Sequence, residues 1–94
     1  MPLAVLTLQL YLHGCSSLKE KRSRLKPLIL RLHREFNISV AEVDLQDSWQ
    51  SAVVACAIIS SDAAHNQRSL QSTIAWIEHS WPDVEVVSEH IEAI

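Results

Sequence analysis

The sequence predicts an α+β domain with the ferredoxin-like βαββαβ plan, a four-stranded antiparallel sheet with two helices on one face. Three observations lead to this prediction: a length of 94 residues that suits one domain, strand and helix patterns in that order, and a third strand that is apolar on both faces. Right-handed crossovers then place the first and third strands in the centre of the sheet. We expect a single domain over residues 1–94.

The first strand and the first helix have the clearest patterns. Residues 4–12 carry an alanine and four leucines at alternate positions, which is the period of a strand. Ser16 or Ser17 can cap a helix over residues 18–36, and Pro27 predicts a kink or a weak point within it. The apolar stripe of this helix consists of Leu18, Leu25, Leu28, Ile29, Leu32 and Phe36.

Two strands are expected after the first helix, which Asn37 can end. The second strand covers residues 38–45 and projects Glu42 and Asp44 on one face. A polar turn separates it from a third strand over residues 49–60, whose centre is apolar on both faces, as in a strand inside a sheet.

A second helix and a last strand complete the plan. Asp62 can cap the helix, and Pro82 follows its end. Residues 84–91 then form the fourth strand. The buried stripe of the second helix is expected to consist of Leu70, Ile74, Ile77 and Trp81.

Composition favours a cytoplasmic protein with reduced thiols. Cys15 and Cys56 offer one bridge at most, which is not a disulfide scaffold. The N-terminal residues lack the basic region of a secretory signal and are too few for a membrane span, so no membrane partner is expected. The five histidines show no zinc-ligand spacing, and we expect neither a metal nor a cofactor.

Positive charge is concentrated in the first helix. The net charge is +5 over residues 16–35 (seven basic residues against two acids) and −8 over residues 36–94 (one arginine against nine acids). Such a basic face suits an anionic partner, and cations in the first turn also oppose the helix dipole. The candidate anion- or RNA-binding residues are Lys19, Lys21, Arg22, Arg24 and Lys26.

The sheet face away from the helices is the second candidate surface. It carries the other row of the first strand and one of two apolar rows of the third strand, and such a patch usually marks an interface. RNA is not expected there, because the RNP1 motif is absent and the acids Glu42, Asp44, Glu85, Glu89 and Glu92 would repel phosphates. The candidate interface residues are Val5 and Tyr11 on this face, Trp49 at the hairpin, and Trp76, which falls off the buried stripe of the second helix.

No catalytic constellation is present. Cys15 is followed by Lys21 and then Arg22, so the C-x5-R spacing of a phosphatase loop is missed by one residue. Acylphosphatases share this topology, but the loop after the first strand here has no arginine before Arg22, so the fold alone does not support that activity. An enzyme, if this is one, would use His13, Cys15 and Lys19.

Several short motifs resemble the bacterial domain-of-unknown-function 503 family, the YlxP-like proteins. They lie in the segment SLKEKRSRLKPLILRLHREFNISVAEVDLQDSWQ, at residues 17–22, 36–44, 47 and 49–50, and continue with Ser60 and Asp62. The resemblance implies a small ferredoxin-like cytoplasmic protein with no established activity and no catalytic residues to carry over. Its genes often stand beside genes for translation initiation and ribosome maturation, which implies a link to RNA.

Three functions follow from these observations. Our leading prediction is a non-catalytic accessory factor that associates with RNA or the ribosome through the basic first helix. The alternative is a protein–protein interaction module, a homodimer formed through the apolar sheet face without nucleic acid. The third is a small enzyme with a site in the loop between the first strand and the first helix.

Overall fold

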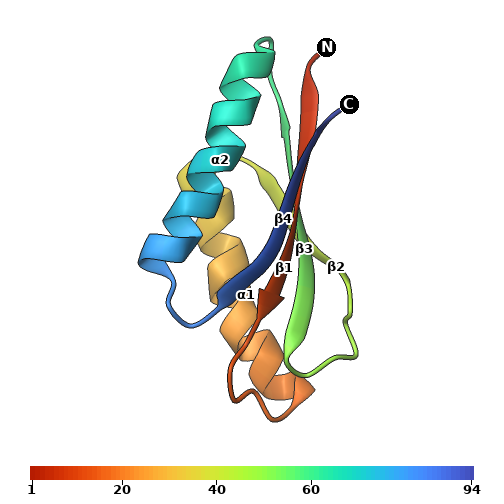
Figure 1. Ribbon diagram of the computed structural model, residues 1–94, viewed down its shortest axis with the longest axis vertical. Coiled ribbons are helices and arrows are strands. Elements are labelled where there is room, and N and C mark those ends of the chain that lie inside the picture. Colours follow the sequence, from red (N-terminus) through yellow and green to blue (C-terminus); the bar gives the residue numbers. More distant parts are fainter.

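A computed structural model describes all residues from 1 to 94. The elements follow the predicted order, and Figure 1 shows the two helices on one side of the sheet. They are β1 (Leu3–Tyr11), α1 (Leu18–Phe36), β2 (Ser39–Asp44), β3 (Ser51–Ile59), α2 (Ala63–Ser80) and β4 (Glu85–Ala93). Neither helix combines the length and the apolar character that a membrane crossing requires.

The sheet has the strand order β2-β3-β1-β4, and all neighbouring strands are antiparallel. The first and third strands are therefore central, as predicted. Two irregularities shift the pairing, one between Gln9 and Leu10 against β4 and one between Glu42 and Asp44 against β3. Both edges of the sheet belong to the more polar strands, β2 and β4.

The core lies between the sheet and the two helices. Leu6, Leu8 and Leu10 of β1 have no exposed surface, and they pair across the sheet with Cys56, Val54 and Ala52 of β3. Cross-strand partners share a face, so this register decides which row of β3 is covered by the helices. The open face receives the other row, Val53, Ala55, Ala57 and Ile59.

The helix ends follow the expected capping chemistry. Ser17 is the N-cap of α1, and its hydroxyl oxygen accepts a hydrogen bond from the Glu20 backbone N–H at 3.0 Å. Asn37 ends the helix in the left-handed conformation with φ 49°. Asp62 caps α2 through the Ala64 N–H at 2.9 Å. The helix α1 continues through Pro27, which is exposed.

The connection between β2 and β3 is longer than the sequence suggested. The third strand begins at Ser51 rather than at Trp49, because residues 45–48 form a turn in which the Ser48 N–H donates to the Leu45 carbonyl at 2.9 Å. Leu45 has φ 58°, a left-handed conformation that is strained for a leucine. Trp49 therefore lies in an exposed turn before the strand, with 54% of its surface accessible.

Candidate functional site

Lys21 is buried beneath α1, which corrects its assignment as a candidate anion- or RNA-binding residue. Only 1% of the residue is accessible. Its Nζ donates to the Leu45 carbonyl oxygen at 2.8 Å and lies 2.8 Å from Glu42 Oε2. This ammonium group ties α1 to the end of β2 and is not available to an external anion.

Glu42 meets Lys21 because the regular register of β2 from Ser39 to Glu42 places it on the helix side of the sheet; the irregularity that follows moves Asp44 to the open side. Glu42 lies opposite Val54, whose side chain is buried on the helix side of the sheet.

Glu89 likewise lies opposite Leu8, on the helix side. The expectation that all five acids of the edge strands lie on the open face is therefore corrected. Those opposite open-face residues are Asp44, Glu85 and Glu92.

Arg24 is also engaged within the domain. Its Nε and one terminal nitrogen bind Asp83, at 3.0 Å from the carboxylate and 2.8 Å from the carbonyl oxygen. The other terminal nitrogen donates to the His13 carbonyl at 3.0 Å and to Glu20 at 3.4 Å. The hydrogen bond to Asp83 raises the pKa of Arg24 above its ordinary value. The Arg24 side chain thus connects the loop after β1, which contains His13, to the loop before β4, which contains Asp83.

Three of the predicted basic residues remain free. Lys19, Arg22 and Lys26 are exposed, and none has an ion pair or a side-chain hydrogen bond within the domain. Spacings of three and four residues place them on one face of α1. We call these three residues the basic row. At 1.5 Å per residue, the row extends roughly 10 Å along the helix.

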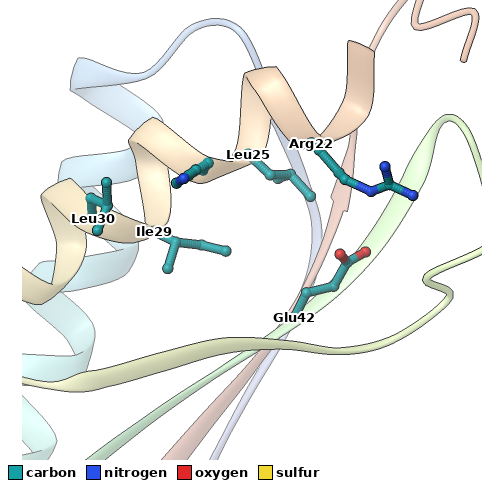
Figure 2. A pocket seen from close by; sticks show the side chains of 6 residues that line it. Arg22, Leu25, Ile29, Leu30 and Glu42 are labelled. Carbon is teal, nitrogen blue, oxygen red and sulfur yellow. The ribbon is translucent and has the colours of Figure 1, made fainter. Parts of the chain in front are cut away.

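A groove lies beside the basic row, between α1 and the free edge of β2. Its volume is about 390 Å³, and it is lined by Arg22, Leu25, Lys26, Ile29, Leu30 and Glu42. Figure 2 shows Arg22 and Leu25 on the helix, facing Glu42 on the strand. The groove thus combines an aliphatic wall, two cations from the basic row and one carboxylate.

Val5 and Tyr11 both lie on the open sheet face and are half-buried. Val5 pairs with Ala57, and the Tyr11 ring packs edge-on against His13 with the centroids 4.6 Å apart. Ile59, at the end of the same face, is 59% exposed. Together with Val53 and Ala55, these positions form a mainly apolar surface on the open face of the sheet. Acidic residues of the edge strands β2 and β4 border this surface.

The two tryptophans named as interface candidates lie elsewhere. Trp49 is in the turn between β2 and β3, whereas Trp76 is half-buried on α2. Trp76 packs against Phe36 and Trp81, with ring centroids 6.1 and 5.9 Å away, and Arg31 lies 5.5 Å above it. The four candidate interface residues therefore do not make one surface.

The loop after β1 does not assemble a nucleophilic site. The Cys15 thiol is buried and donates to the Ser17 carbonyl at 3.5 Å. His13 is exposed and its Nε2 lies 2.7 Å from Glu85 Oε1, while Lys19 points to solvent with the basic row. No hydrogen bond joins His13, Cys15 and Lys19, so nothing here activates the thiol.

The position of Cys56 inside the core also makes its thiol unreactive. It is fully buried in β3, and burial raises the pKa of its thiol to about 12. No group of three or more His, Cys, Asp or Glu side chains is arranged to hold a metal ion.

Two features of the site were not identified from the sequence, although signals for both were present. Lys21 stands four and seven residues before Leu25 and Leu28, a spacing that places it on the buried side of the helix. Leu30 falls outside the apolar stripe and is 52% exposed, and an apolar residue in that position indicates a surface contact. The partnership of Lys21 with Glu42 depends on folding and has no local signal.

Comparison with known proteins identifies relatives across most of the chain. Residues 3–91 match the family described as "Protein of unknown function (DUF503)". The chain is also 36% identical over 74 residues to the "Uncharacterized protein YlxP" of Bacillus subtilis (strain 168), which covers 79% of each protein.

Proposed function

The chain belongs to the DUF503 family, and we propose that it is a cytoplasmic, non-catalytic accessory factor that binds RNA through the basic row on α1. One observation carries this proposal: Lys19, Arg22 and Lys26 are aligned, exposed and free of any partner in the domain. Association with the ribosome, whose surface is rich in RNA phosphates, is the physiological form that we propose for this binding.

The contrast between engaged and free cations supports a functional origin for the row. Lys21, Arg24 and Arg31 have partners within the domain, and their presence is explained by packing and ion pairs. Lys19 lies in the first turn of α1, where the helix dipole makes positive charge unfavourable. Helix stability therefore does not account for Lys19, whereas attraction of phosphates accounts for Lys19 together with the rest of the basic row.

The acidic remainder of the domain favours one orientation of RNA. Glu85 and Glu92 lie on the side of the open sheet face, and Asp83 and Glu89 lie at the same edge of the sheet. A polyanion is repelled from these groups and attracted to α1, so the charge distribution steers it to one side of the molecule.

The test is RNA binding by an Arg22→Glu/Lys26→Glu variant. Two charge reversals in the row are expected to abolish measurable binding to ribosomal RNA fragments or to isolated ribosomal subunits, as followed by fluorescence anisotropy or co-sedimentation. An Arg34→Glu/Arg68→Glu variant is the matched control, because it changes the net charge equally at exposed positions outside the row. Equal loss in both variants, or in neither, would remove the proposal.

The open sheet face supports a second candidate function, self-association. The observation that favours it is the continuous apolar row from Val53 to Ile59, which is only half-buried and lies beside Val5. An Ala57→Arg variant is expected to shift a dimer toward monomer in analytical ultracentrifugation, whereas Ser72→Arg on the exposed side of α2 leaves it unchanged. A wild-type protein that stays monomeric at high concentration would contradict this candidate.

A further inference from the structure

We propose that the groove between α1 and β2 holds one unpaired nucleotide of the bound RNA and favours a base that carries an exocyclic amino group. This inference rests on the proposed RNA binding, since the groove shares Arg22 and Lys26 with the basic row. It adds to that function a preference for single strands and a discrimination among bases, neither of which follows from charge alone.

The groove has the size and the surface that a nucleotide requires. Its volume of about 390 Å³ is at the lower end of the range of ligand sites, roughly 300–1,000 Å³. Leu25, Ile29 and Leu30 supply an aliphatic wall, and Leu30 is 52% exposed with no partner in the domain to cover it. Apolar surface of this kind is stabilised when the face of a base displaces water from it.

The cations at the groove are placed to hold both the base and the backbone. Arg22 and Lys26 are one helical turn apart and both line the groove. A guanidinium plane stacks on unpaired bases, as in many single-strand complexes, while a lysine ammonium binds phosphate as a point charge. We assign Arg22 to the base and Lys26, together with Lys19, to the flanking phosphates.

Glu42 supplies the preference among bases. Its Oε2 lies 2.8 Å from Lys21 Nζ in an ion pair, no side chain of the domain forms an ion pair with Oε1, and the Glu42 side chain is 21% exposed. Figure 2 shows the carboxylate directed from β2 toward the helix side of the groove. A carboxylate oxygen accepts from an exocyclic amino group, such as N4 of cytosine, and repels the carbonyl oxygen that uracil has at the same position.

A duplex cannot make these contacts. One N4–H of a paired cytosine is used in the base pair and the other lies in the deep, narrow major groove of A-form RNA, where side chains cannot reach it; the faces of stacked bases are covered by their neighbours. The basic row of a single helix also follows only one phosphate strand. The groove therefore selects single-stranded segments, loops or ends.

The experiment compares a short cytidine homopolymer, a uridine homopolymer of the same length and a blunt RNA duplex, each labelled with fluorescein. We expect the cytidine strand to bind roughly tenfold more tightly than the uridine strand, because one base-edge contact to a carboxylate differs between them. The duplex is expected to bind more weakly than the cytidine strand. Glu42→Gln is expected to abolish the difference between cytidine and uridine, because an amide both accepts and donates.

A second variant covers the case in which Glu42→Gln does not fold. Leu30→Ser removes part of the exposed wall, and Val87→Ser removes an equally exposed side chain on β4, away from the groove, as a matched control. Leu30→Ser is expected to weaken cytidine binding roughly fivefold without changing its salt dependence, since no phosphate contact is lost. The control leaves both unchanged.

The outcomes separate this inference from the proposed function. Equal affinity for cytidine, uridine and duplex, with no effect of Leu30→Ser, would overturn the nucleotide site while the loss on Arg22→Glu/Lys26→Glu still supported the basic row. Failure of the wild type to bind any of the three RNAs would overturn both.

Discussion

Replacement of Lys21 by methionine tests whether a buried cation ties helix α1 to the hairpin of β2 and β3. Methionine preserves the length and the apolar stem of the side chain but removes the charge. The variant leaves the Glu42 carboxylate and the Leu45 carbonyl without their common donor, which lies 2.8 Å from each in the wild type.

The size of the effect follows from the burial of the pair. Removing one partner of a fully buried ion pair lowers the free energy of unfolding by about 3–5 kcal/mol. Lys21 is almost completely buried, but the Glu42 side chain keeps 21% exposure and can be partly hydrated. We therefore expect the lower end, about 3 kcal/mol. In a domain of this length that corresponds to a decrease in Tm of roughly 12–24 °C.

Urea denaturation followed by tryptophan fluorescence measures this loss. Lys26→Met is the matched control, because it makes the same chemical change at an exposed position and is expected to stay within about 0.5 kcal/mol of the wild type. Adding Glu42→Met to Lys21→Met is expected to restore about 2 kcal/mol, since two apolar groups replace the pair. The reasoning is refuted if Lys21→Met is as stable as Lys26→Met. It is also refuted if the losses of stability from Lys21→Met and Glu42→Met add up in the double variant.

Three further predictions concern capping and burial. Ser17→Ala removes the acceptor of the Glu20 N–H and is expected to lower the free energy of unfolding by about 1 kcal/mol; an unchanged Tm would contradict the capping role. At Asn37, where φ is 49°, Ala is expected to lower the free energy of unfolding by about 1 kcal/mol in urea titrations, whereas Gly is expected to maintain it; equal stability of the two would contradict the strain argument. Burial raises the pKa of the Cys56 thiol from 9.0 to about 12, so the unfolded chain releases this proton at lower pH than the folded chain. Stability should therefore decrease as pH rises from 9 to 12, and Cys56→Ala should show a shallower decrease; identical slopes would argue against burial of the thiol.

The fold could be predicted because its signals are local and periodic. Alternation of apolar residues in β1, the helical stripe of α1 and the capping residues Ser17 and Asp62 each act within a few residues, and together they limit the topology. The start of β3 was misplaced because the turn after Leu45 depends on its left-handed backbone and on the ammonium group of Lys21, which comes from another element.

The candidate site was predicted only in part for the same reason. Charge and position identify a basic helix, but they do not distinguish a free lysine from one that is paired in the folded state. Helical spacing places Lys21 on the buried side of α1 and Lys19 two residues away on another side, but the pairing of Lys21 with Glu42 from β2 has no local signal. The groove depends on that strand too, so its lining was not visible in the helical pattern of α1 alone.

The salt dependence of RNA binding tests the basic row most directly. If Lys19 and Lys26 each contact one phosphate while Arg22 stacks on a base, log K should fall with log salt concentration with a slope of about −1.4 for a single strand. The Arg22→Glu/Lys26→Glu variant should lose binding, and single Lys19→Gln or Lys26→Gln variants should each reduce the slope by about 0.7. A slope near zero, or one that these substitutions do not change, would contradict the account.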